Sequence, residues 1–563
     1  MRIVCKQTGS PFTVSDKDLA FYEKISPLIG QHKLVVPPPS LSPEARQRRR
    51  LTFRNERTLY RRKCDLSGQA ILSTYAMDAP MPVYNHKAWF SDCWDPMRYG
   101  QSFDFNRTFF EQFQELLKAV PMFSLHHQVD NENCDFTNLV SRNKNSYFIF
   151  AALENEDCFY STYLHHCTDI DDCYFVFNCE LCYECIDCYD CYSVKYSQRC
   201  NNCNESDYLI ECKGCSNCFG CVSLANKKYC IFNQTFSKDQ YEKIVQEILS
   251  RPDKETYIAK HLRKLTQEVG LKYYSGLNNE NAVGDHISNC KNVYYCFDCT
   301  NLEDCSYCTW LHYSKDCYDC YAWGSIGELG LENHLCGNNF FHLMFCDQCW
   351  GDVANLLYCK GCWGNCRNLF ACAGLHHKEY CIFNVQYSKE DYEKLVPQIV
   401  SHMQKTKEWG EFFPEPLSPY GYNETVAQEY FPLTREQVAN NGWNWRGAPL
   451  PGTFGQETAS ISDYQQEIGN IEDSVCEEIF ACKNTAKNFR ITTAELKLYK
   501  KLGVRLPESC FDERYMIRKN KRTDRKLHQR QCDNCETNII STYDSSDTKR
   551  ILCEDCHKQS AYA

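Results

Sequence analysis

The sequence predicts a multidomain, mainly β protein whose centre is a cysteine-rich β-solenoid in two duplicated halves. Three observations lead to this fold class. The chain of 563 residues holds 41 cysteines, thirty of them in residues 151–400. Residues 227–245 recur with close similarity as residues 378–396, which indicates the duplicated halves. Residues 46–75 recur as residues 514–543, so we expect two related α+β caps, one on each side of the solenoid.

Short segments in the cysteine-rich region indicate the repeating unit. Each places small polar residues before a cysteine and aromatic residues near it, as at Asp157 and Asp316, and such segments return every 12–15 residues. Units of this kind cannot bury an apolar face alone and stack on their neighbours as coils. Ser237 and Ser388 are each followed three residues later by Gln or Asp, so we expect each half to end in a helix that begins there.

The repeats divide the chain into five expected domains, since 563 residues are too many for one hydrophobic core. In the connector that follows the second half, Thr434 and Gln437 predict a short helix. The expected domains are an N-terminal cap at 1–110, solenoid half 1 with its terminal helix at 111–250, solenoid half 2 with its terminal helix at 251–405, the connector at 406–470 and a C-terminal cap at 471–563.

The expected compartment decides how the cysteines are interpreted. The chain begins without an apolar signal-peptide core, and no run approaches the roughly 18 apolar residues of a membrane span, so a cytoplasmic location is expected. Cysteine pairs in large cytosolic proteins hold metal more often than they form disulfides. Several zinc ions are the expected cofactors, because zinc needs no redox partner or assembly machinery.

The last four cysteines form the most specific metal motif. Cys532 and Cys535 are followed by Cys553 and Cys556, a spacing that lets two tight turns meet at one tetrahedral zinc ion. A redox-active pair is the alternative, but residues 539–552 between the two CxxC units are typical of a hairpin.

The N-terminal copy of this motif has lost ligands. It keeps Cys64 and Cys93, while Ser67 and Phe90 occupy the other two places, so no zinc is expected there.

A second half-motif lies upstream in the C-terminal cap. It keeps Cys482 and Cys510, with Thr485 and Glu513 where second cysteines would stand. With these motifs the caps resemble the zinc-ribbon, treble-clef-like modules of bacterial proteins. The whole layout is similar to an uncharacterised cysteine-rich zinc-ribbon family of candidate-phylum bacteria. This resemblance covers nearly the full chain and implies zinc-ribbon-like caps, but it brings no known activity.

Cysteine pairs within the solenoid are candidate ligands for further zinc ions. Successive pairs begin twelve or thirteen residues apart, so pairs on neighbouring coils can meet in sites of four thiolates. The alternative is that these cysteines are small buried hydrophobes in a ladder. The candidate ligands are Cys200, Cys203, Cys212, Cys215, Cys305, Cys308, Cys317, Cys320, Cys346, Cys349, Cys359 and Cys362.

Iron–sulfur and soft-metal chemistry are minor alternatives. The run from Cys179 to Cys191, with a cysteine at every third residue, is similar to a ferredoxin cluster loop. No cysteine in the chain precedes a proline as that loop requires, so an Fe–S cluster is not expected. The same run is compatible with a store for soft metals.

Arginines lie at helical spacing in both caps. Ser42 and Pro43 are typical of a helix N-terminus, and the arginines that follow share one face. The formal net charge of −11 therefore includes two expected cationic helices. Their guanidinium groups fit the phosphates of RNA or of the ribosome. The alternative is docking on the acidic solenoid or on a second subunit. The candidate nucleic-acid-binding residues are Arg46, Arg50, Arg54, Arg57, Arg61, Arg514, Arg518, Arg522 and Arg525.

The expected function is that of a zinc-binding structural scaffold that engages RNA or a ribonucleoprotein. We find no phosphate loop, nucleophile elbow, dinucleotide fingerprint or HExxH motif, so an enzyme, a small-molecule substrate and a membrane are not expected. Two other classes stay open: a self-assembling structural protein that forms homo-oligomers without nucleic acid, and a metal-storage or Fe–S redox protein.

Overall fold

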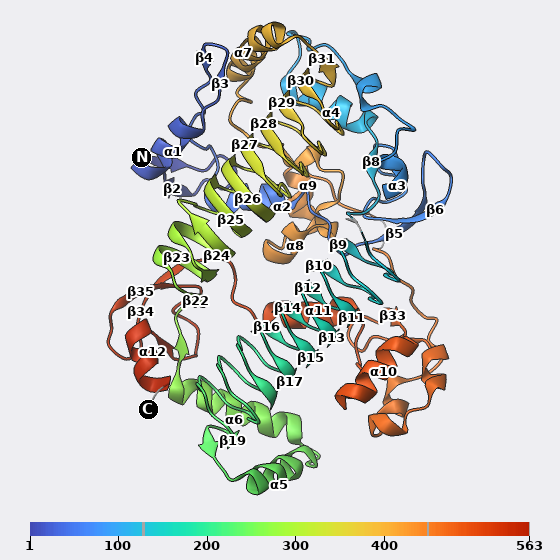
Figure 1. Cartoon of the computed structure of the whole chain (residues 1–563), viewed down its shortest axis with the longest axis vertical. Helices are drawn as coiled ribbons and strands as arrows, with labels where there is room; N and C mark the ends of the chain where they lie inside the picture. Colours follow the sequence, from blue (N-terminus) through green and yellow to red (C-terminus); the bar gives the residue numbers. More distant parts are fainter. Residues whose placement is uncertain (127–129, 448–449, 562–563) are drawn as a thin grey trace. The chain divides into compact units, whose positions relative to one another are not determined.

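The computed structural model describes residues 1–126, 130–447 and 450–561 and is a mixed α/β protein with parallel sheets (Figure 1). Contacts divide it into two compact units. Unit 1 comprises residues 1–125 and 274–450, and unit 2 comprises residues 126–273 and 451–563. Each unit thus combines one terminal segment with the half of the cysteine-rich region that is distant from it in sequence, whereas the sequence suggested five consecutive domains.

Unit 2 contains two parallel five-stranded sheets that alternate along the chain. Thr162 pairs with Tyr174, and Thr168 pairs with Glu180, so the chain advances twelve residues from one rung to the next. We call this arrangement the unit 2 stack. Its strands are β9 (Asn138–Ser141), β10 (Phe150–Leu153), β12 (Thr162–His165), β14 (Tyr174–Phe177) and β16 (Ile186–Tyr189) in one sheet, and β11 (Glu156–Phe159), β13 (Thr168–Asp171), β15 (Glu180–Tyr183), β17 (Tyr192–Lys195) and β18 (Asn204–Asp207) in the other.

Unit 1 contains a ten-stranded sheet whose strands follow one another in chain order. They are parallel except for the last pair. The rungs of this unit 1 stack are twelve residues apart where Phe297 pairs with Thr309, and thirteen where Phe340 pairs with Val353. Its strands are β22 (Gly276–Leu277), β23 (Glu280–Ser288), β24 (Lys291–Glu303), β25 (Thr309–Tyr318), β26 (Tyr321–Leu331), β27 (Phe340–Met344), β28 (Val353–Leu357), β29 (Arg367–Phe370), β30 (Glu379–Ile382) and β31 (Val385–Gln386).

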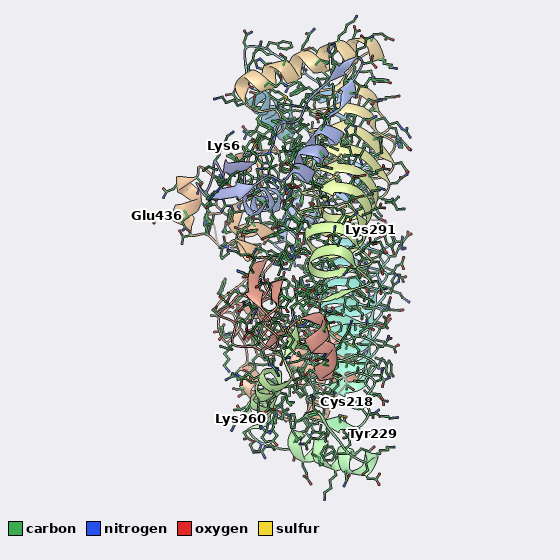
Figure 2. All side chains as sticks on the ribbon, turned by 90° about the vertical axis from the view of Figure 1, so that its left-hand side faces the viewer. Lys6, Cys218, Tyr229, Lys260, Lys291 and Glu436 are labelled. Carbon is green, nitrogen blue, oxygen red and sulfur yellow. The ribbon has the colours of Figure 1, made fainter. Side chains whose placement is uncertain are left out.

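A left-handed residue at almost every third position bends both stacks. In unit 2, Asp169, Asp172 and Phe175 have φ of 56°, 53° and 56°. This backbone region is costly for most L-residues and least so for Gly, Asn and Asp. Each of the thirty stack cysteines directly follows such a residue, and all thirty are buried. Figure 2 labels one example, Cys218, which is buried, and Lys291 on the exposed surface of the other stack.

The terminal segments and the ends of the stacks supply the helices and the remaining short strands. The capping residues expected at Ser42, Ser237, Ser388 and Thr434 are confirmed, since each side chain accepts a backbone N–H of its helix. Unit 1 has helices α1 (Asp16–Ile25), α2 (Pro43–Leu51), α3 (His86–Trp89), α4 (Phe109–Ala119), α7 (Lys389–Thr406), α8 (Val426–Tyr430) and α9 (Arg435–Asn440), and strands β1 (Arg2–Val4), β2 (Pro11–Thr13), β3 (Leu28–Ile29), β4 (His32–Lys33), β5 (Tyr60–Lys63), β6 (Ala70–Ser73), β7 (Val83–Tyr84) and β8 (Met122–Phe123). Unit 2 has helices α5 (Lys238–Leu249), α6 (Lys254–Val269), α10 (Thr493–Leu502), α11 (Phe511–Asn520) and α12 (Glu554–Ala561), and strands β19 (Cys230–Ile231), β20 (Gln234–Thr235), β21 (Leu271–Lys272), β32 (Phe480–Ala481), β33 (Asn488–Phe489), β34 (His528–Gln531), β35 (Asn538–Ser541) and β36 (Ile551–Leu552).

The arginine-bearing helices are shorter than the sequence pattern suggested. Helix α2 ends at Leu51 and helix α11 ends at Asn520. The expectation that all the arginines share one helical face is therefore wrong. In both caps the later arginines of the series lie on the chain beyond the helix.

The left-handed positions lead to a stability prediction. Asn217 has φ of 51°, and a β-branched residue is strained there, so Asn217→Val should lower the free energy of unfolding by roughly 1–2 kcal/mol. Asn217→Gly should lower it less, because glycine tolerates this backbone. Urea unfolding measures both. Ser216→Val, one position earlier, is the control, and an equal loss in that variant would contradict the backbone explanation.

Candidate metal centre and arginine locks

Four thiols in unit 2 lie close enough to share one metal ion. The Sγ atoms of Cys532, Cys535, Cys553 and Cys556 all lie within 4.8 Å of one another, and those of Cys535 and Cys553 are 3.7 Å apart. Within the described ranges, no other group of three or more His, Cys, Asp or Glu side chains gathers in this way. The structure thus brings together the four residues of the strongest sequence motif.

A tight turn and a helix N-terminus position these thiols. The first pair lies in the β34–β35 hairpin, where the N–H of Cys532 donates to the carbonyl of Thr537 and the N–H of Glu536 donates back to Cys532. The second pair lies where α12 begins. The Cys553 N–H donates to Cys532 Sγ at 3.2 Å, which ties the two pairs together.

Hydrogen bonds prepare two of these sulfurs for the thiolate state that metals require. Desolvation raises the pKa of Cys532, but backbone N–H donors from Cys553 and Cys535 outweigh it, and the pKa is lowered. The Thr537 hydroxyl is the largest of several contacts that lower the pKa of Cys535 to about 6. Asn534 also donates its side-chain amide to Cys556 Sγ at 3.3 Å.

The same turn occurs four times among the residues that the structure describes. We call it the knuckle turn: the first cysteine donates its N–H to a carbonyl five residues ahead, and the residue four ahead donates back to the cysteine carbonyl. That fourth residue has positive φ in every copy. The four first cysteines are Cys5, Cys64, Cys482 and Cys532.

Each knuckle turn faces the N-terminus of a helix. Ser42 and Asn85 cap α2 and α3, Cys510 precedes α11, and Cys553 precedes α12. The Asn85 N–H donates to Cys64 Sγ at 3.2 Å, as the Cys553 N–H does to Cys532. The sequence comparison had placed Phe90 and Cys93 at this position, and the structure corrects it to Asn85, with Ala88 three residues later.

Three of the four knuckle turns form with fewer than four cysteines. Hydroxyl and backbone N–H groups of Thr8 and Ser42 overcome desolvation and lower the pKa of Cys5 to about 7. Corresponding donors from Thr485 and Cys510 do the same for Cys482. Hydrogen bonds thus take the place of missing ligands, which explains how these turns persist.

The solenoid cysteines that were expected to form four-thiolate sites lie inside the stacks. Their thiols donate to main-chain carbonyls: Cys203 Sγ reaches the carbonyls of Asn201 and Cys212 at 3.5 and 3.4 Å. Burial raises the pKa of the candidate thiols Cys200, Cys305 and Cys359. Desolvation also raises the pKa of Cys320 and Cys349, but hydrogen bonds with neighbouring thiols outweigh it and lower the pKa of both. This geometry favours the packing interpretation over the ligand interpretation. It applies to Cys200, Cys212, Cys215, Cys305, Cys308, Cys317, Cys320, Cys346, Cys349, Cys359 and Cys362, which are all buried with a thiol to carbonyl contact.

In unit 1, arginines of α2 clamp one buried aspartate of the stack. Arg46 Nε and Arg50 Nη2 donate to the two carboxylate oxygens of Asp319 at 2.9 and 3.0 Å. Arg49 and Arg50 also share Glu332. Arg50 is 1% exposed and Asp319 is 0% exposed, so these charges are fully withdrawn from water.

Unit 2 repeats this arrangement with the corresponding residues. Arg514 and Arg518 both bind Asp172, and the Arg518 contact measures 2.7 Å. Asp172 and Asp319 each have positive φ and each precede a stack cysteine. We call the two assemblies the arginine locks, each consisting of one stack aspartate and its two arginines.

Aromatic rings extend both locks in the same way. The Arg54 guanidinium lies over the rings of Trp310 and Tyr321, 5.4 and 5.2 Å from their centroids. The corresponding Arg522 lies over Tyr174 and Phe175 and also pairs with Asp187. Such cation–π contacts are strongest when water is excluded.

Most of the arginines expected to bind nucleic acid therefore lie inside the fold. Six are buried, two are half-buried and one is exposed. This is the alternative of docking on the acidic solenoid that the charge pattern left open. The buried ones are Arg46, Arg50, Arg54, Arg514, Arg518 and Arg525, the half-buried ones are Arg57 and Arg522, and the exposed one is Arg61.

Comparison with known proteins assigns no family. No protein-family model matches the chain, and no curated protein matches it. The helices in the described ranges include none with both the length and the apolarity needed to cross a bilayer.

The arginine lock in unit 1 can be tested by removing its aspartate. Asp319→Ala leaves two buried guanidinium groups without that partner, so the free energy of unfolding should fall by roughly 3–5 kcal/mol in urea titrations. The control is Glu115→Ala, which breaks an exposed pair with Arg107 and should lower the free energy of unfolding far less. Equal losses in the two variants would refute the lock.

Unit 2 should also show a specific pH dependence. Burial raises the pKa of Glu495, which accepts a hydrogen bond from Tyr499, from 4.5 to about 7. Between these values the folded state holds a proton that the unfolded state has lost, so stability falls as pH rises through this window. Glu495→Gln should remove on the order of 3 kcal/mol of this dependence, measured by urea unfolding at pH 4.5 and 7.5. Identical pH profiles for the two proteins would contradict the assignment.

Proposed function

We propose that the protein is a zinc-dependent scaffold in which two β-solenoids are each capped by a terminal segment through an arginine lock. The convergence of Cys532, Cys535, Cys553 and Cys556 within 4.8 Å carries the metal part of this proposal. Four thiolates without an open position are typical of structural zinc rather than catalytic zinc. The twelve-residue register and the inward cysteines support the solenoid part.

Zinc would stabilise the point where the C-terminal segment joins the rest of unit 2. The four cysteines connect the β34–β35 hairpin to α12, and β36, just before α12, pairs in parallel with β21. Lys272 of β21 also forms an ion pair with Glu554 of α12 at 2.7 Å. Because a structural zinc site contributes its binding energy to folding, metal loss should loosen this whole region.

The contacts of the arginine locks do not support an RNA partner. Guanidinium groups of both arginine locks are paired with carboxylates inside the fold, and a phosphate would have to displace those carboxylates. Buried pairs of this kind are costly to separate. The burial of these groups favours a structural scaffold over a nucleic-acid binder.

Metal analysis tests the proposal directly. The native protein should contain zinc by mass spectrometry, and Cys535→Ser should lose one zinc per chain and show a lower unfolding temperature. Cys93→Ser, which changes an exposed cysteine outside the motif, should keep the full metal content. Absorbance of anaerobically purified protein in the visible range, together with iron instead of zinc, would overturn zinc in favour of an Fe–S cluster.

A further inference from the structure

Unit 1 contains a cavity of about 350 Å³ to which neither the metal motif nor the arginine locks belong. Its walls come from α4 and nearby N-terminal residues, from the stack and from the connector after α7. A volume of this size suits a small organic molecule.

The charged residues of the wall are all cationic. Lys118, Lys360 and Arg446 contribute to it, and no acidic side chain is among the described lining residues. Lys360 and Arg446 are paired with carboxylates outside the wall, whereas Lys118 is exposed. A concave site with an excess of one charge attracts the opposite charge, so Lys118 favours a negatively charged ligand.

Lys360 is held in place by a buried polar column. Its ammonium group donates to Asp347 at 2.5 Å, and the other Asp347 oxygen contacts His334 Nδ1 at 2.7 Å. These three residues follow one another at thirteen-residue intervals, one on each rung of the stack. Desolvation lowers the pKa of Lys360, but Asp347 outweighs it, so the lysine keeps its charge although it is only 3% exposed.

Such a column is hard to explain by stability alone. Burying an ion pair costs about as much in desolvation as the pair returns, and apolar residues of similar volume often serve as well. Buried charges at the wall of a cavity are more typical of a binding site. The column thus places an ammonium group, whose charge Asp347 balances, where the cavity meets the stack.

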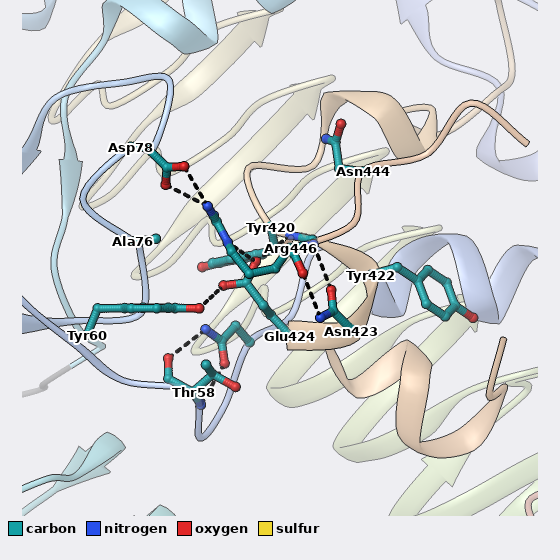
Figure 3. A network of polar contacts seen from close by, with 12 residues as sticks. Thr58, Tyr60, Ala76, Asp78, Tyr420, Tyr422, Asn423, Glu424, Asn444 and Arg446 are labelled. Carbon is teal, nitrogen blue, oxygen red and sulfur yellow. Dashed lines mark hydrogen bonds and ion pairs between the residues drawn. The ribbon is translucent and has the colours of Figure 1, made fainter. Parts of the chain in front are cut away.

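Arg446 is fixed from the opposite side by a second network (Figure 3). Its Nη1 donates to both oxygens of Asp78 at 2.6 and 2.8 Å, and its Nε donates to Glu424 at 3.2 Å. Its main chain exchanges hydrogen bonds with the Asn423 side chain, and Tyr60 donates to Glu424. This network orders the connector, for which the sequence suggested no chemistry.

The rest of the wall is suited to a flat apolar group. Met81 and Met122 supply adaptable thioethers, which make favourable contacts with aromatic rings. Trp445 and Tyr420 supply ring faces, and Tyr420 is itself stacked on Tyr75 at a centroid distance of 5.1 Å. Aromatic ligands gain most from such surroundings.

We propose that this cavity binds a small aromatic organic anion, with the ring against the thioethers and Trp445 and the anionic group toward Lys118. The anionic group is a carboxylate or a phosphate, since guanidinium and ammonium groups recognise both. The proposal is independent of the zinc site, because the cavity lies in unit 1 and the four cysteines lie in unit 2.

Fluorescence titration of the full chain with the aromatic anion anilinonaphthalene sulfonate tests the site. Binding should saturate at one probe per chain. Lys118→Glu reverses an exposed charge at the wall and should weaken binding about tenfold. Leu117→Trp should abolish binding by filling the cavity. Lys87→Glu, the same charge change at an exposed lysine of α3 outside the cavity, should bind like the native protein.

Competition then identifies the ligand class. Phenyl phosphate or benzoate should displace the probe, and whichever competes better identifies the preferred anionic group. Inorganic phosphate should compete poorly, and equal competition by it would overturn the aromatic requirement. Probe binding that Lys118→Glu and Leu117→Trp leave unchanged, or that Lys87→Glu weakens equally, would overturn the site.

Discussion

The left-handed residue that recurs at almost every third position is the constraint on which the structure depends. It turns the chain so that the next side chain points inward, and in both stacks the cysteines occupy that inward position. Cysteine is small and apolar enough for a narrow interior, and its thiol can also donate to a carbonyl. A larger residue at every inward position would overpack so narrow a core.

The arginine locks depend on the same backbone feature. Asp172 and Asp319 occupy left-handed positions, where aspartate is among the better tolerated residues. Their burial would be prohibitive without strong partners, and the paired guanidinium groups supply both charge and hydrogen bonds. Each terminal segment is thereby committed to one stack, which accounts for a unit made of two segments far apart in the chain.

The four knuckle turns keep one backbone geometry with different numbers of thiols. In the turn at Cys532 all four thiols are present, whereas in the turns at Cys5, Cys64 and Cys482 hydroxyl and N–H groups replace some of them. The helix whose N-terminus each turn faces is present in all four. Turn geometry and helix capping depend on a few neighbouring residues, so they form without metal coordination.

Local sequence signals determined much of this protein. The duplications, the capping residues and the CxxC pairs at Cys532 and Cys553 depend on neighbouring residues, so they could be predicted from the chain. The three-residue period is also visible in the run from Cys179 to Cys191, where the sequence offers metal binding only as a minor alternative. Only the fold decided that most of these thiols pack in the interior instead of sharing metal ions. The distances between cysteines on neighbouring rungs depend on the turn at each third residue.

The arginines show where sequence reasoning reached its limit. Their spacing predicted a cationic face, yet a charge pattern alone cannot show whether water or a distant carboxylate will surround it. Asp319 lies more than 260 residues from Arg50 in the sequence. Lys360 lines its cavity together with residues of the connector, which are also distant from it in the sequence. Composition and short motifs thus determined which groups exist and which turns they form. Tertiary structure decided which charges are buried, because burial depends on contacts between segments that the sequence holds far apart.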